Sequence, residues 1–169
     1  MKLATLTTSA LVVASIILSS EIAVAQTGMT ANYIGAGVSA GLTHGIHNND
    51  DTVFGGNVQG RFAVPQTPIS ARGAVLFGGD AVSIVPTITY DLPIAKKTNL
   101  YIGGGYSFNT SEGRNTQLGT RDATVLTLGA ESEVSKNIVA YGDAKWAIDA
   151  YKNSSGDAVS LQAGVGLRF

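Results

Sequence analysis

The sequence contains no cysteine in its 169 residues, which excludes a disulfide framework and a metal site built on thiolates. Charge is also scarce: 14% of the residues are charged, the formal net charge is −1, and no basic cluster indicates binding to nucleic acid. Beyond the N-terminus, no stretch reaches the roughly 20 consecutive apolar residues of a membrane-spanning helix. If the mature chain crosses a membrane, it must therefore do so as a closed barrel.

The N-terminus has the pattern of a secretory signal peptide. Met1-Lys2 gives it a positive start, residues 11–18 form a short apolar core, and Ala23-Val24-Ala25 is a small-x-small cleavage site. We expect residues 1–25 to be removed. Residues 26–169 then form one domain, since no linker, repeat or low-complexity tract divides them.

The stretch from Ala158 to Phe169 shows a pattern that repeats along the chain. Every second residue back from Phe169 is apolar, and the residues between are small or polar, which predicts a β-strand with one apolar face. Pro86 interrupts another such strand, so we expect a bulge or a lost hydrogen bond there. Seven earlier segments alternate in the same way: 34–42, 54–64, 69–77, 82–92, 100–108, 126–134 and 138–149. The predicted fold is all-β, an eight-stranded antiparallel up-and-down transmembrane β-barrel.

The charged residues avoid the apolar face of every predicted strand. A Lys or Arg on a lipid-facing position would cost about 2–4 kcal/mol at the middle of a bilayer, so a lipid-facing band predicts this distribution. The charges that fall within strands all lie on the polar face, and we expect them to form a lumenal network: Arg61, Arg72, Asp91, Glu131, Glu133, Asp143, Lys145, Asp149 and Arg168.

The large aromatic residues of the apolar face gather near strand ends. Two such belts are typical of a membrane barrel, whereas a soluble barrel or sandwich turns its apolar face inward and has no reason to place aromatics there. The belt near the short turns is predicted to contain Phe62, Tyr90 and Phe169, and the belt near the longer loops Phe54, Phe77, Tyr106, Phe108 and Trp146.

Together, the signal peptide, the eight amphipathic strands and the ending Val165-Gly166-Leu167-Arg168-Phe169 resemble the small outer-membrane barrels of Gram-negative bacteria, of the OmpA-transmembrane-domain and OmpX type. The resemblance implies a location in the outer membrane, among its lipids. It also implies that Val165, Leu167 and Phe169 are read as a signal by the barrel-assembly machinery. It implies location and fold more than activity.

Three functions remain open from the sequence. The first is a structural or surface-interaction role, in which a monomeric barrel has a lumen plugged by charged side chains and loops that bind an extracellular ligand or surface. The second is a narrow porin-like channel for ions or small solutes. The third is an enzyme that modifies outer-membrane lipids. We favour the first, because eight strands enclose an interior that side chains can fill.

A single loop holds the residues that suggest metal or catalytic chemistry. His44 and His47 lie beside Asp50 and Asp51, but no second cluster completes a metal shell, and no nucleophile motif accompanies them. We therefore expect no catalytic residues, no metal site and no cofactor.

Overall fold

The computed structural model describes residues 28–43, 53–111, 114–152 and 155–169. The predicted signal peptide, residues 1–25, lies outside these ranges, as do His44 and His47. In the described part of the chain, no helix is long and apolar enough to cross a membrane.

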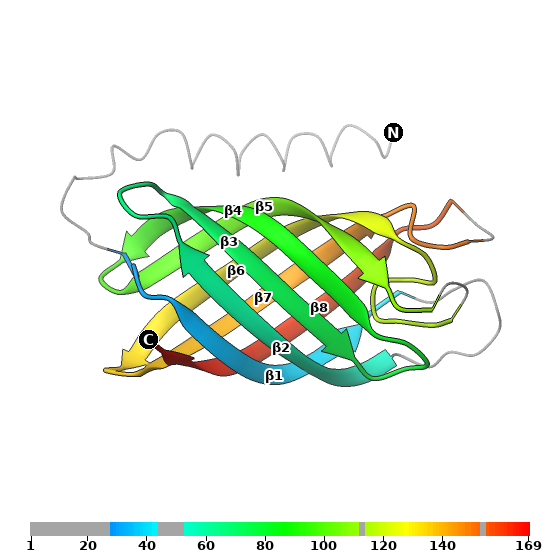
Figure 1. The fold of residues 1–169 in the computed structure, drawn as a ribbon, viewed down its shortest axis with the longest axis horizontal. Helices are drawn as coiled ribbons and strands as arrows, with labels where there is room; N and C mark the ends of the chain where they lie inside the picture. The colour runs from blue at the N-terminus through cyan, green and yellow to red at the C-terminus, as the bar shows by residue number, and fades with distance from the viewer. Residues whose placement is uncertain (1–27, 44–52, 112–113, 153–154) are drawn as a thin grey trace, which may run out of the picture.

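The chain forms a closed antiparallel barrel in which each strand pairs with the next and the first pairs with the last (Figure 1). This confirms the predicted eight-stranded up-and-down fold. The strands are β1 (Tyr33–Gly41), β2 (Val53–Ala63), β3 (Ile69–Phe77), β4 (Ser83–Ala95), β5 (Thr98–Asn109), β6 (Ala123–Ser135), β7 (Ile138–Ile148) and β8 (Ala158–Arg168).

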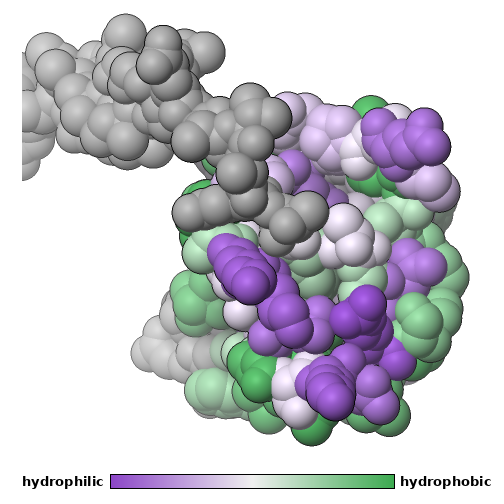
Figure 2. All heavy atoms as spheres, turned by 90° about the vertical axis from the view of Figure 1, so that its left-hand side faces the viewer, coloured by the Kyte–Doolittle hydropathy of each residue, from purple (hydrophilic) through white to green (hydrophobic). Residues whose placement is uncertain are grey.

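The two ends of the barrel differ. Turns follow β2, β4 and β6 at one end, which we call the turn end. The connections after β1, β5 and β7 are longer than any of these turns and lie at the loop end, together with the short β3–β4 connection. In Figure 1 the turn end is on the left, where the chain also ends. Figure 2 looks onto the turn end and shows hydrophilic side chains gathered there, with hydrophobic ones toward the periphery.

The outer surface is apolar along every strand, because alternate residues point outward. Large hydrophobic side chains that a soluble protein would bury are exposed, among them Val38 at 70%, Leu128 at 59% and Val165 at 61%. The buried side chains lie on the other face of the same strands and are mostly polar or charged. The barrel therefore has inverted polarity relative to a soluble protein.

Two apolar clusters lie inside the barrel, one toward each end. The cluster at the turn end contains Met29, Ala31, Tyr33, Val139 and Tyr141. The cluster at the loop end joins strand residues to Leu118 of the β5–β6 connection, and its members are Ala74, Leu76, Val85, Leu118, Ala123, Val125, Ala147, Ala150 and Ala158. Buried polar residues also accompany the loop-end cluster, since Ser83 and Ser107 are register partners of its members Leu76 and Ala123.

Pro86 interrupts the sheet without a bulge, which is one of the two predicted outcomes. The pairing of β4 with β5 keeps one register on both sides of it, from Ile84↔Phe108 to Thr87↔Gly105, so there is no bulge at this position. Val85 and Pro86 themselves take no part in this pairing, because proline has no N–H to donate. The irregularities of register lie instead at the turn end, between Pro93 and Ala95 and between Glu133 and Ser135.

Candidate functional site in the barrel lumen

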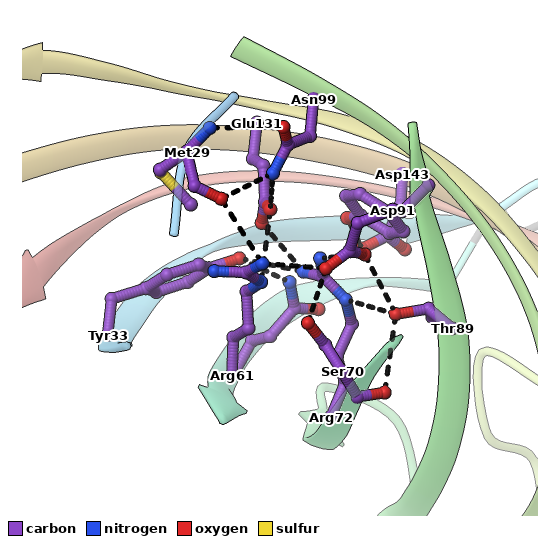
Figure 3. A network of polar contacts seen from close by, with 12 residues as sticks. Met29, Tyr33, Arg61, Ser70, Arg72, Thr89, Asp91, Asn99, Glu131 and Asp143 are labelled. Carbon is purple, nitrogen blue, oxygen red and sulfur yellow. Dashed lines mark hydrogen bonds and ion pairs between the residues drawn. The ribbon is translucent and has the colours of Figure 1, made fainter. Parts of the chain in front are cut away.

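Two arginines and two carboxylates form a ring of alternating charge in the turn-end half of the lumen (Figure 3). Arg61 contacts Asp91 at 2.6 Å and Glu131 at 3.1 Å, and Arg72 contacts the same two residues at 3.1 and 2.8 Å. The residues come from β2, β3, β4 and β6, and all are buried. The formal charge of the ring is zero, as burial requires, since an unpaired charge in this position is costly.

Polar side chains of the neighbouring strands complete the ring. Ser70 donates a hydrogen bond to Asp91, and Thr89 Oγ1 donates to Asp91 Oδ1 at 3.1 Å while it accepts from Arg72 Nε at 3.0 Å. Asn99 Nδ2 donates to Glu131 Oε1 at 3.2 Å. The ring is thus hydrogen-bonded as well as charge-paired, and this fixes the side chains in one arrangement.

A second polar layer continues from the ring toward the middle of the barrel. The guanidinium of Arg72 lies over the ring of Tyr101, 3.6 Å from its centroid. The Tyr101 hydroxyl donates to Asp143 Oδ2 at 2.9 Å, and Lys145 Nζ donates to Asp143 Oδ1 at 2.7 Å. Arg72 therefore connects the charged ring to a buried Lys–Asp pair.

Beyond this layer, several buried polar atoms have no hydrogen-bond partner among the described residues: Ser39 Oγ, Thr87 Oγ1, Thr127 Oγ1 and both amide atoms of Gln162. Ser39 and Asp143 are both register partners of Gln162 on the flanking strands, and Thr127 is the partner of Lys145. The wall formed by β6, β7, β8 and β1 is thus polar and unsatisfied, which favours bound water there.

The β5–β6 connection closes the lumen from the loop end. Leu118 is fully buried in the apolar cluster of that end. Beside it, Gln117 Nε2 donates to the backbone oxygen of Phe77 at 3.2 Å, and Thr116 and Gly119 form an isolated β-bridge. Gly119 has φ of +99°, a conformation that glycine adopts without strain. The loop therefore folds back into the barrel.

A leader of five residues, 28–32, closes the lumen from the turn end. Met29 and Ala31 are 3% and 6% exposed. Asn99 holds Met29 through two hydrogen bonds, from Met29 N to Asn99 Oδ1 at 3.0 Å and from Asn99 Nδ2 to Met29 O at 2.7 Å. Arg61 donates to the backbone oxygen of Met29 (Figure 3) and to that of Ala31.

The residues predicted for the lumenal network fall into three places. Arg61, Arg72, Asp91, Glu131, Asp143 and Lys145 are buried together in the two polar layers. Glu133 and Arg168 lie apart from them at the turn end, where Glu133 pairs with both Arg168 and Lys97 at 2.8 Å.

Glu133 and Arg168 therefore lie at the mouth and not in the lumenal network, and Asp149 departs further from the predicted set. It lies beyond the end of β7 with a side chain that is 52% exposed, and it pairs with Arg121 of the β5–β6 connection. Its φ of +54° is outside the β region, so the alternation of inward and outward residues ends at Ile148. Asp149 therefore belongs to the loop end, outside the lumen.

The predicted aromatic residues all lie on the outer surface near strand ends. Phe62 and Phe169 contact each other edge to face at the turn end, with centroids 6.0 Å apart, and Tyr106 and Phe108 lie 5.0 Å apart toward the loop end. The others are exposed as well: Phe54, Phe77, Tyr90 and Trp146. Val165 and Leu167 point outward on β8 in line with Phe169.

Sequence reasoning missed the parts of the lumen that come from outside the strands. Met29 and Leu118 lie in segments without periodicity, so no pattern assigned them to the interior. Asn99 and Tyr33 were detectable in principle, since both continue the inward alternation of their strands. Among the described residues, no group of three His, Cys, Asp or Glu residues is placed to hold a metal ion.

No protein-family model matches this sequence, and a comparison with curated proteins gives no significant match. Solved structures do match. Ail, the attachment invasion locus protein of Yersinia pestis, solved with the heparin analogue sucrose octasulfate, matches with a TM-score of 0.55 and 16% identity over 83% of this chain and 99% of that chain. Neisserial surface protein A matches with a TM-score of 0.58 and 15% identity over 82% of this chain and 97% of that chain.

A designed protein from work on de novo transmembrane β-barrels matches with a TM-score of 0.50 and 15% identity, over 82% of this chain and 96% of that chain. At these identities the likeness shows the fold, a small closed antiparallel barrel. Evolved surface proteins and a designed chain share that fold, so the function has to be argued from the lumen and the surface of this chain.

Proposed function

We propose that the protein is a monomeric outer-membrane β-barrel with a closed lumen, which supports the membrane and displays its loops at the cell surface. The observation that carries this proposal is the inverted polarity, with apolar side chains outside and paired charges inside. An apolar surface around the whole barrel promotes aggregation in water, whereas in hydrocarbon it is favourable, and closure leaves no strand edge unpaired.

A location in the outer membrane is supported by three features together. The predicted signal peptide directs the chain out of the cytoplasm, the aromatic residues lie near both ends of the strands, and Val165, Leu167 and Phe169 form the terminal pattern of the resembled family. In such barrels short turns face the periplasm and longer loops face outward. The loop end of this barrel is therefore the surface that a ligand would meet.

A closed lumen is supported by three obstacles along one path. From the turn end these are the leader, the charged ring with the Tyr101 layer, and the apolar cluster around Leu118. An interior of eight strands is just wide enough for side chains to fill. Opening a path requires the displacement of segments or the separation of buried ion pairs.

The experiment is single-channel recording of the purified, refolded protein in planar lipid bilayers. We expect no steady conductance from the wild type. Steady channels whose conductance changes on Glu131→Gln would overturn the closed-lumen proposal, because they would place the ring on an ion path.

That result would favour the second candidate, a narrow channel. The specific observation behind this candidate is the polar wall with unpartnered atoms at Ser39, Thr127 and Gln162, because a hydrated wall is what an ion or small solute would need. The wall lies between obstacles on both sides, and for that reason we rank the channel second.

Location and orientation have a separate test. An epitope inserted at Asp80, in the β3–β4 connection, should bind antibody on intact Gram-negative cells that express the protein. The same epitope at Lys136, in the turn after β6, should bind only after the outer membrane is permeabilised. Binding at both positions on intact cells, or at neither, would contradict the proposed topology.

A further inference from the structure

We propose that the turn-end mouth of the barrel is a binding site for an extended peptide backbone, and that the chain's own leader, 28–32, occupies it as a displaceable intramolecular ligand. The site does not depend on which membrane holds the barrel. It is distinct from the closed-lumen proposal, because the charged ring and the Leu118 cluster remain when the leader leaves.

The mouth recognises mainly the backbone of the leader. Asn99 pairs with the N–H and the C=O of Met29, in the manner of a neighbouring β-strand. Arg61 donates to the carbonyl oxygens of Met29 and Ala31, and the backbone N–H of Phe169 donates to the carbonyl oxygen of Asn32 at 3.1 Å. These contacts fix an extended chain of almost any sequence.

Two features select the side chains of the ligand. The Met29 side chain enters the apolar cluster with Tyr33, Val139 and Tyr141, which suits a long, unbranched apolar residue. A methyl group added at Gly28 would lie 2.1 Å from Asn99 Oδ1, so a larger residue before Met29 would displace the Asn99 side chain from its pairing with Met29. The preferred ligand is therefore an extended Gly–apolar segment.

The receptor side of the site is held in place without the leader. Asn99 also donates to Glu131, and Arg61 is fixed by both Asp91 and Glu131. The groups that bind the peptide are thus preorganised, which lowers the entropy cost of binding.

The leader also forms no part of the paired strands. Pairing of β1 with β8 begins at Tyr33↔Arg168, one residue after the leader ends, and the same is true of β1 with β2 at Tyr33↔Arg61. Release of the leader therefore breaks no strand pair. Besides the contacts of Met29 and Ala31, it breaks the two hydrogen bonds that Asn32 accepts, from Phe169 N–H at its backbone oxygen and from Ala63 N–H at its Oδ1. The leader can thus detach at a lower free energy than global unfolding.

The first test uses thiol labelling in the full-length protein, which has no cysteine of its own. Met29→Cys is labelled with a polar maleimide in the folded barrel, with Lys136→Cys as the exposed control at the same end. We expect labelling at position 29 to be at least about ten-fold slower, the effect of roughly 1.4 kcal/mol of protection. Labelling at equal rates would overturn the proposal, because it would place the leader outside the mouth.

Displaceability is measured in the same variant with rising urea. Position 29 should become reactive at urea concentrations where the fluorescence of Trp146, the single tryptophan, is still that of the folded protein. Labelling that coincides with global unfolding would show the leader to be a fixed part of the barrel and would overturn the proposal. This measurement leaves the receptor groups, Asn99 and Arg61, unchanged.

The last test supplies the ligand from outside. In the double variant Met29→Asp, Ala31→Asp, charged side chains keep the leader out of its apolar site. A fluorescent peptide of residues 26–32, Gln-Thr-Gly-Met-Thr-Ala-Asn, should then bind saturably, and should bind at least ten-fold more weakly when Asn99→Ala is added. Equal anisotropy with and without Asn99→Ala would mean that the peptide binds only to detergent, and would overturn the peptide site.

Discussion

Arg61 of β2 and Arg72 of β3 are direct cross-strand partners, and both extend into the lumen to the same two carboxylates, Asp91 and Glu131. Like charges in opposite positions of neighbouring strands repel each other. Here each carboxylate lies between the two guanidinium groups and compensates their repulsion, so that the four side chains form a closed ring. The pairing of these arginines thus depends on acids supplied by β4 and β6, on the adjoining strand and across the barrel.

The ring predicts a large effect from the loss of one carboxylate. In Glu131→Gln, Arg61 and Arg72 share Asp91 alone, and one buried positive charge is left uncompensated. We expect the free energy of unfolding to fall by about 3–5 kcal/mol, the usual cost of breaking a buried pair. Urea titration followed by Trp146 fluorescence measures it.

Glu133→Gln is the matched control, because this acid of the same strand pairs with Lys97 and Arg168, whose side chains are half exposed. Water replaces much of such a pairing, so the loss of stability should be clearly smaller. Equal losses in the two variants would contradict the buried ring.

We expect replacement by alanine to have different effects on the free energy of unfolding at two glycines of the barrel. Gly129 is the register partner of Tyr101, and a methyl group added there would lie 2.4 Å from Tyr101 Cζ and 2.6 Å from Asp143 Cβ. Gly129→Ala therefore forces the Tyr101 layer apart, and we expect it to lower the free energy of unfolding by about 1–3 kcal/mol.

Gly104 faces outward, and a methyl group added there meets no atom within 4 Å. Gly104→Ala should leave the stability unchanged or raise it by up to about 1 kcal/mol, since alanine has less freedom in the unfolded chain. The two variants are compared by urea titration under identical conditions. A larger loss in Gly104→Ala would refute the inward packing of Tyr101.

The loop-end closure predicts a local effect on proteolysis. Leu118 anchors the β5–β6 connection, and replacing a buried leucine by alanine removes about 2–5 kcal/mol of packing. In Leu118→Ala we expect trypsin to cut after Arg114 at least ten times faster, with the barrel still folded by circular dichroism. Ser111→Ala, at an exposed position of the same connection that is not adjacent to the scissile bond, should be cut at the wild-type rate. Unchanged cleavage in Leu118→Ala would mean that the connection does not depend on its buried residue.

The barrel itself was predictable from the sequence because strand alternation is a local signal. A residue such as Arg72 or Glu131 is assigned to the inside by its immediate neighbours alone. Which charges meet is a different matter: Arg61 and Asp91 are 30 residues apart, and their contact follows from the register and closure of the sheet. The alternation alone does not show where a strand ends, and for this reason the sequence predicts a lumenal position for Asp149.

The two segments that close the ends of the barrel could not be predicted from local sequence patterns. Met29 and Leu118 are single apolar residues in polar surroundings, and such residues are usually unremarkable in loops. Their burial follows from the width of the mouth and from partners such as Asn99, which only the assembled barrel brings together. The part of the site that could be predicted is the part built by strands.

Phe169 has a packing contact in the structure and a predicted role in assembly, and two substitutions distinguish these roles. Its ring packs edge to face on Phe62, so Phe169→Ala and Phe62→Ala remove the same aromatic pair, and both should lower the stability of the refolded protein to a similar extent, by about 0.5–1.5 kcal/mol beyond the lost area. In cells the two variants should differ. If Phe169 is also read by the assembly machinery, Phe169→Ala should reduce the heat-modifiable, folded barrel in the outer-membrane fraction several-fold, whereas Phe62→Ala should assemble almost normally. Equal assembly of both variants would leave Phe169 with its packing role alone.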